Sequence, residues 1–186
     1  MRLVKRFGDV AEGRPFVRPR VFFAPILLLL ALPASSASEA AGTTGEVLLG
    51  RTGAAEVLAI SPEWRRGYDE YQPAPEDVAV VRQAPAGSLV MVYFGSWCSD
   101  SRLGVPQFLK IVDAAQAPNL KVRYLAVDRS KKEPAGPLEG VGLELVPTFV
   151  LSVHGKEIGR IVETPATTIE HDLALLLRKA TSSPAS

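Results

Sequence analysis

The sequence predicts an α/β protein in which a mixed central sheet is flanked by helices. Three runs have the length and apolar composition of strands, at residues 89–94, 121–127 and 148–153. Apolar residues at helical spacing follow the first run and recur near the end of the chain. The 186 residues are 47% hydrophobic and 22% charged, which is typical of a globular protein with one well-buried domain.

The first forty residues have the order of a secretory signal peptide. A basic lead precedes an apolar run over residues 21–32, and small residues follow at 33–38. We therefore expect residues 1–37 to be a signal peptide, cleaved near Ala37, that exports the protein to the periplasm. The alternative is an uncleaved membrane anchor, but the run is shorter than the ~20 residues of a spanning helix and contains Pro25.

Cleavage would leave a chain without a basic patch. Six of the 21 basic residues and two of the 20 acidic residues lie in the predicted signal peptide, so the mature chain carries a small net negative charge. Nothing in this balance indicates nucleic acid as a partner. Contact with a membrane is expected only through an uncleaved N-terminal segment.

Residues 38–84 are predicted to be a flexible lead followed by an N-terminal helical extension. The first eight of these residues are small and polar, and the rest have a mixed, mostly helical pattern. Ser61 before Pro62 is a good helix N-cap, and Pro75 begins a second short helix in the same way. This extension is expected either to pack on the sheet or to contact a partner.

The main domain is expected over residues 85–180. Its first strand, at 89–94, is continuously apolar and therefore suits a position buried on both faces. A helix from Cys98 to about Gln116 follows, and Pro106 should kink its axis. The domain is completed by a strand at 121–127, a charged connection at 128–142, a hairpin of strands at 148–153 and 157–162, and a helix from Thr167 or Thr168 to about Lys179. Residues 181–186 are expected to form a flexible tail.

Cys98 is the only cysteine and the leading candidate for a reactive group. It begins a helix at the carboxyl end of a central strand, where α/β sheets place their sites. The positive end of a helix favours the thiolate, which is the reactive form of cysteine, whereas the carboxylate of Asp100 opposes it. In an exported chain, a single cysteine suggests pairing with another molecule or a reactive thiol. The alternative is an ordinary half-buried thiol.

Further residues accompany Cys98 in a recognisable pattern. Trp97 precedes it after a buried strand, Pro106 lies eight residues beyond it, and Val146-Pro147-Thr148 stands before the hairpin. Together they resemble the thioredoxin superfamily over roughly residues 85–180. The resemblance implies a thioredoxin-like fold in which Pro147 is cis and lies against Cys98, while Trp97 shelters the sulfur. It also implies that Val146, Pro147 and Thr148 bind an extended substrate peptide as an added strand.

Two positions depart from the pattern of that superfamily. Ser101 replaces the second cysteine of the motif, so an intramolecular attack that releases substrate from a mixed disulfide is not available. Val92 replaces the buried acid that many thioredoxins carry six residues before the nucleophile. The chain is therefore not expected to be a conventional dithiol reductase. Ser101 is either a hydrogen-bond donor to the thiolate or a simple residue of the first helical turn.

The sequence thus predicts an exported monothiol protein that acts in thiol–disulfide exchange. Cys98 and Ser101 are the predicted catalytic residues, and Trp97 with Val146-Pro147-Thr148 the predicted substrate-binding residues. The partners would be protein thiols or disulfides in extended peptide segments, or a small thiol, although the tryptophan before Cys98 argues against glutathione. No cofactor is expected, because one cysteine and two scattered histidines do not make a metal site. The alternative is a non-catalytic module that binds a peptide in the same groove.

Overall fold

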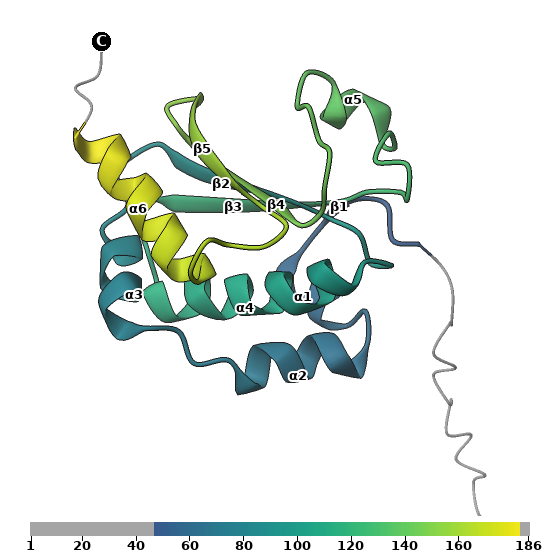
Figure 1. The fold of residues 1–186 in the computed structure, drawn as a ribbon, viewed down its shortest axis with the longest axis horizontal. Coiled ribbons are helices and arrows are strands. Elements are labelled where there is room, and N and C mark those ends of the chain that lie inside the picture. Colours follow the sequence, from purple (N-terminus) through teal and green to yellow (C-terminus); the bar gives the residue numbers. More distant parts are fainter. Residues whose placement is uncertain (1–46, 183–186) are drawn as a thin grey trace, which may run out of the picture. The chain divides into compact units, whose positions relative to one another are not determined.

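A five-stranded mixed sheet with helices packed against it forms the part of the chain that the structure, a computed structural model, describes (Figure 1). This part comprises residues 47–182. The predicted signal peptide and the predicted lead before residue 47 lie outside the described residues, and so does the predicted tail from residue 183.

The sheet has the strand order β1-β3-β2-β4-β5. The strands are β1 (Gly50–Thr52), β2 (Ser88–Phe94), β3 (Leu120–Ala126), β4 (Thr148–Val153) and β5 (Lys156–Val162). β2 and β3 are parallel, and the other neighbouring pairs are antiparallel. A mixed sheet flanked by helices is therefore confirmed, with β2 at its centre as its apolar sequence predicted.

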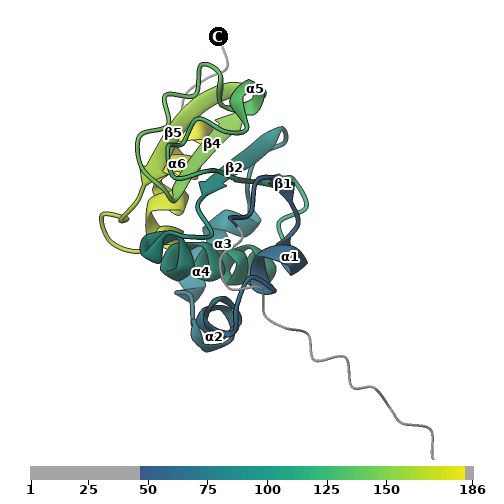
Figure 2. The same cartoon turned by 90° about the vertical axis from the view of Figure 1, so that its right-hand side faces the viewer.

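The helices gather mainly on one side of the sheet, as Figure 1 shows. They are α1 (Ala54–Leu58), α2 (Pro62–Glu70), α3 (Pro75–Arg82), α4 (Ser99–Ala115), α5 (Ala135–Leu138) and α6 (Ile169–Ser182). In the side view of Figure 2, α4 lies between the sheet and α2. The core between α4 and the sheet includes an aromatic pair, since the ring centroids of Phe108 and Phe149 lie 4.9 Å apart.

The N-terminal helices share this core. Trp64 of α2 is 1% exposed and meets the ring of Phe94 edge-on, with centroids 5.7 Å apart. Glu170 of α6, which is also buried, accepts hydrogen bonds from the hydroxyl of Tyr71 at 2.7 Å and from the N–H of Ala74 at 3.1 Å. Burial and the bond to Glu170 both raise the pKa of Tyr71. The helical extension is therefore fastened to the last helix and to the sheet.

Most predicted elements are confirmed, with small shifts at their ends. α2 and α3 begin at Pro62 and Pro75 as predicted. α6 continues to Ser182, two residues into the segment predicted as a tail. Pro106 lies inside α4 and faces Gly67 of α2, where an added Cβ would come within 3.5 Å of the proline ring.

Two short elements were not predicted. The segment before residue 84 was expected to be mostly helical, but it begins with β1, which pairs with β3 from Gly50↔Ala126 to Thr52↔Tyr124. Three residues carry no periodicity, and this strand depends on a partner about seventy residues away in the sequence. The charged connection at 128–142 likewise contains α5, a single turn of helix without a buried residue.

Candidate functional site

Cys98 is the N-cap of α4 and ends the loop that leaves β2. Its backbone is extended, with φ −92° and ψ 131°. Its N–H donates to the carbonyl of Gly95, and its own carbonyl accepts from the N–H of Arg102, each at 3.0 Å. The half-buried side chain therefore stands at the end of a long helix where backbone N–H groups are free to interact with an anion.

The sulfur faces the peptide bond before β4. Sγ of Cys98 lies 3.2 Å from the carbonyl oxygen of Val146, and the Val146–Pro147 peptide is cis. The next residue, Thr148, opens β4 and donates its hydroxyl to the carbonyl of Leu145 at 2.7 Å. The structure thus brings Cys98 against Val146, the first of the three residues that the resemblance assigned to substrate binding.

Ser101 has a different neighbour. It is fully buried in the first turn of α4, and its hydroxyl accepts a hydrogen bond from the N–H of Gly95 at 3.2 Å. Among the described residues, its side chain makes no hydrogen bond to the sulfur of Cys98. The hydroxyl therefore holds the loop between β2 and α4 in place through Gly95 and not through the sulfur of Cys98.

Trp97 is held by three neighbours beside the site. Its Nε1–H donates to the carbonyl of Val127 at 3.0 Å, just beyond the end of β3. Its ring packs against Gly95, where a Cβ would come within 2.5 Å of the ring. The guanidinium carbon of Arg129 lies 5.2 Å from the ring centroid, within the range of a cation–π contact. The orientation of Trp97 is therefore fixed by the loop and by the end of β3.

Two hydrogen-bond acceptors lie near the sulfur of Cys98. Besides the Val146 carbonyl, a carboxylate oxygen of Asp100 lies 3.9 Å from Sγ. Both are oxygen atoms, so this geometry suits an S–H group that donates. The thiol would have to release its proton before it could attack another sulfur.

Apolar and charged side chains border the site in positions that the sequence did not reveal. Leu145 and Val162 are 43% and 39% exposed on either side of the buried Val146–Pro147 peptide. Glu163 follows β5, and its N–H donates to the carbonyl of Pro147 at 2.7 Å. Its φ of +55° is unusual for a glutamate, and nothing in a Val-Glu-Thr sequence signals it.

The position six residues before the cysteine carries no acid. Val92 is fully buried in the centre of β2, within the apolar core between the sheet and the helices. No proton acceptor therefore lies behind the site at this position.

The described residues form no metal-binding cluster and no membrane-spanning helix. Across residues 47–182, no three His, Cys, Asp or Glu side chains gather as metal ligands do. His171 instead contacts Asp77, with 3.1 Å between Nδ1 and Oδ2. None of the helices between residues 47 and 182 is long and apolar enough to cross a membrane.

Comparison with known proteins gives one family and a small set of related structures. The model of a family described as thioredoxin matches residues 57–174. No curated protein matches this sequence.

Among solved structures, an HIV epitope-scaffold is 14% identical with a TM-score of 0.53, over 72% of this chain and 94% of that chain. A protein of unknown function from Pseudomonas aeruginosa is 17% identical with a TM-score of 0.44, over 69% and 76%. Thioredoxin f from spinach chloroplast is 22% identical with a TM-score of 0.39, over 55% and 77%. At 14% identity, the likeness to the HIV epitope-scaffold concerns the fold alone.

Proposed function

The chain belongs to the thioredoxin family, and from this we propose that it acts in thiol–disulfide exchange with Cys98 as its single nucleophile. The observation that carries the proposal is the distance of 3.2 Å between Sγ of Cys98 and the carbonyl of Val146, next to a cis proline. A partner sulfur bound along Val146 would lie beside the sulfur of Cys98.

The reaction would proceed in two exchanges. The Cys98 thiolate attacks one sulfur of a partner disulfide, its electron pair forms the new S–S bond, and the other partner sulfur leaves as a thiolate. An external thiolate then attacks the partner sulfur of this mixed disulfide, and Cys98 leaves as a thiolate. One disulfide is consumed and one is formed, so electrons balance and Cys98 is regenerated.

The external thiol does the work of the second cysteine of the motif, whose position Ser101 occupies. The buried hydroxyl of Ser101 is bound to the Gly95 N–H, so we assign it a positioning role for the loop that presents Cys98. Val92 fits the same picture, since no second cysteine needs a buried acid behind it.

The partner would be a protein segment in extended conformation. Backbone groups of Val146 would pair with it as with an added strand, while Pro147 and Thr148 fix the course of the platform. Trp97 would form one wall of the groove, and the exposed side chains of Leu145 and Val162 would offer apolar contact. A small thiol could serve as the external thiolate.

Export belongs to the same proposal. Its support is the sequence of the first 37 residues, with a basic lead, an apolar run and small residues before the expected cleavage near Ala37. Fractionation of cells that express the full chain, followed by N-terminal sequencing, tests it. A protein that starts close to Ser38 in the periplasmic fraction is expected, and an uncleaved cytoplasmic chain would refute it.

The chemical step is tested with the mature chain and a peptide disulfide. A covalent adduct that intact mass locates on Cys98, and that an added thiol releases, is expected. Cys98→Ser should form none, while Ser99→Ala, which changes an exposed neighbour, should react like the parent chain. If Cys98 reacts no faster than a cysteine in an unstructured peptide, the proposed exchange is wrong.

A second function is favoured by the contact between Sγ of Cys98 and the Val146 carbonyl. In that arrangement the cysteine acts as a hydrogen-bond donor that shapes a peptide groove without chemistry. Such a binding module would keep its partner after Cys98→Ser and lose it after Trp97→Ala. Exchange chemistry predicts instead that Cys98→Ser no longer traps a partner covalently.

A further inference from the structure

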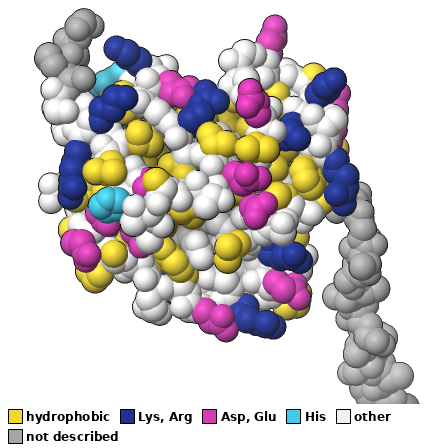
Figure 3. All heavy atoms as spheres, in the orientation of Figure 1, with side chains coloured by type: hydrophobic (Ala, Val, Ile, Leu, Met, Phe, Trp, Pro, Cys, Tyr) yellow, Lys and Arg dark blue, Asp and Glu magenta, His cyan; other side chains and the backbone are white. Residues whose placement is uncertain are grey.

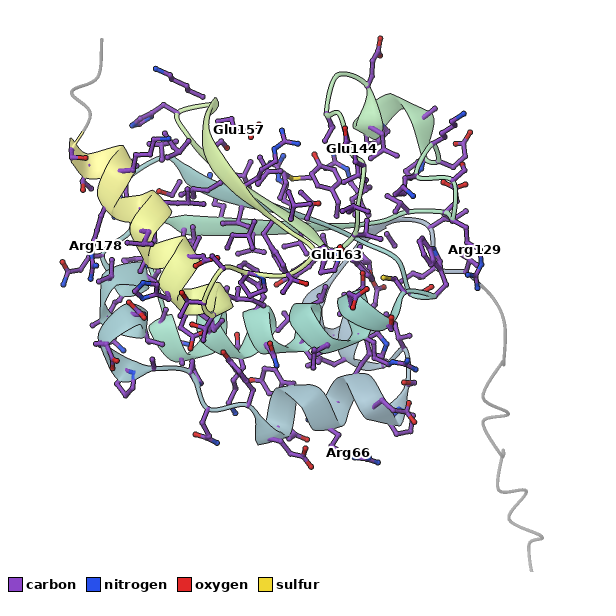
Figure 4. The ribbon with its side chains drawn as sticks, in the orientation of Figure 1. Arg66, Arg129, Glu144, Glu157, Glu163 and Arg178 are labelled. Carbon is purple, nitrogen blue, oxygen red and sulfur yellow. The ribbon has the colours of Figure 1, made fainter. Side chains whose placement is uncertain are left out.

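Two side chains of opposite charge border the site on different sides. Figure 4 labels both: Glu163 lies on the side of β5, and Arg129 on the side of β1. Figure 3 shows that acidic, basic and apolar side chains alternate across this face of the molecule. The charges beside Cys98 therefore differ in sign from one end of the groove to the other.

Glu163 is fixed to the peptide that faces the sulfur. Its N–H binds the Pro147 carbonyl at 2.7 Å, while Cys98 binds the Val146 carbonyl of the same dipeptide at 3.2 Å. The carboxylate of Glu163 forms no ion pair within residues 47–182. A negative charge thus stands at one edge of the groove, available to a partner.

Arg129 is fixed on the other side by Trp97. Its guanidinium carbon lies 5.2 Å from the ring centroid, and Trp97 is itself bonded to Val127. The adjacent carboxylate of Asp128 is occupied, since it accepts from the backbone N–H groups of Ser130, Lys132 and Glu133. Within the described part of the chain, no carboxylate pairs with Arg129.

Other charges near the loop do not cancel this difference. Asp100 adds a second carboxylate, 3.9 Å from the sulfur. Arg102 lines a depression between α2 and α4 together with Glu63 and Arg66, where a hydrogen bond from Ser61 and, to a smaller extent, the charges of Arg66 and Arg102 lower the pKa of Glu63. Beside Trp97, Arg129 is thus a cation that no carboxylate of residues 47–182 neutralises.

We propose that Glu163 and Arg129 select the partner of Cys98 by the order of the charges that flank the partner's cysteine. The preferred partner is an extended segment with a basic residue on the Glu163 side and an acidic residue on the Arg129 side. This inference rests on the proposed exchange function.

Extended geometry supports this kind of selection. Residues on the two sides of a cysteine diverge by about 3.3 Å per position along a strand, and residues two apart point to the same face. The charge two positions before the cysteine and the charge two positions after it therefore reach opposite edges of the groove. With the order reversed, each charge would meet one of like sign.

The test uses two peptides of identical composition, Arg-Ala-Cys-Ala-Glu and Glu-Ala-Cys-Ala-Arg, each activated as a disulfide with a chromophoric aromatic thiol. The rate at which the mature chain releases the chromophore is measured for both. The peptide whose bound orientation places its arginine beside Glu163 and its glutamate beside Arg129 should react at least about threefold faster at low salt. This difference in rate should shrink at high salt. Because net charge is equal, general attraction cannot produce this difference.

Charge variants identify the residues responsible. Glu163→Gln combined with Arg129→Gln should remove the preference, and Glu163→Lys combined with Arg129→Glu should reverse it. Arg178→Gln with Glu76→Gln, exposed charges on α6 and α3, should leave it intact. Equal rates for the two peptides overturn the inference and leave the exchange function standing. Failure of both peptides to react overturns the exchange function and the inference with it.

Discussion

The sulfur of Cys98 and the carboxylate of Asp100 lie 3.9 Å apart at the beginning of α4. The carboxylate suits the positive end of the helix, but it opposes a negative charge on the sulfur. The first turn of the helix thus carries two groups that compete for the same favourable field.

Asp100→Asn should therefore make Cys98 more reactive. Two unit charges about 4 Å apart interact by about 1 kcal/mol in water, so the rate of alkylation at pH 7 should rise by about fivefold. The rate with iodoacetamide measures this. Glu139→Gln, a charge removed from an exposed site at the end of α5, serves as the control and should have no effect. A rate that falls after Asp100→Asn would contradict this account of the site.

Ser101→Ala should destabilise the protein. The buried N–H of Gly95 would lose its acceptor, which costs about 1–3 kcal/mol of unfolding free energy. Urea unfolding measures the change, and Ser99→Ala, at an exposed position two residues earlier in the same turn, should be close to neutral. Equal unfolding free energies of the two variants would show that the hydrogen bond between Ser101 and Gly95 does not stabilise the protein.

Ser101→Cys should convert the chain to dithiol chemistry. Cysteines at the N-cap and the third position of α4 have the spacing at which thioredoxins close a disulfide. The intact mass of the oxidised variant should therefore be lower than that of the reduced variant by two hydrogen atoms. Adducts with peptide disulfides should then be transient, because the new thiol attacks them from within. Stable adducts in this variant would show that its second sulfur cannot reach Cys98.

Gly95→Ala should disturb Trp97. The added Cβ would come within 2.5 Å of the indole ring, so the ring must move and its bond to Val127 must weaken. Overpacking of this kind costs about 1–3 kcal/mol. Gly136→Ala, where a Cβ meets nothing within 4 Å, is the matched control. Urea unfolding and tryptophan fluorescence should both change in the first variant alone.

Alkaline pH should reduce the net stabilisation that the bond between Tyr71 and Glu170 provides, because the tyrosine ionises first in the unfolded chain. The pKa of Tyr71 is raised in the folded state, so its contribution to stability is complete below the unfolded value of about 10 and is lost as the pH rises above it. Tyr71→Phe should be less stable at pH 7, because the buried Glu170 loses a donor, and should lose less stability between pH 9 and 11. Parallel pH profiles for the two proteins would rule out this role of Tyr71.

The sequence predicted those structural features that depend on residues close to one another in the chain. The break at Gly95 and the apolar spacing of α4 placed Cys98 at a helix start, and Pro62 and Pro75 marked two further helices. These signals are local, since caps and periodicity act within a few residues.

The remaining features depend on contacts between distant segments. β1 exists as a strand because β3 lies beside it, and Arg129 belongs to the site because Trp97 reaches Val127. Glu163 lies beside Pro147 through a backbone hydrogen bond and a positive φ. No property of a single residue encodes these juxtapositions, so periodicity and motif spacing did not predict them.

The fastening of α2 and α3 to α6 also sets an order for folding. Glu170 follows Tyr71 by 99 residues, so the N-terminal helices gain this anchor only after the last helix has been synthesised. Contacts of such long sequence separation must overcome a large loss of chain entropy before they contribute, which slows folding. The N-terminal helices can therefore pack early on the sheet through Trp64 and Phe94, but their anchor to the last helix forms only once α6 is present.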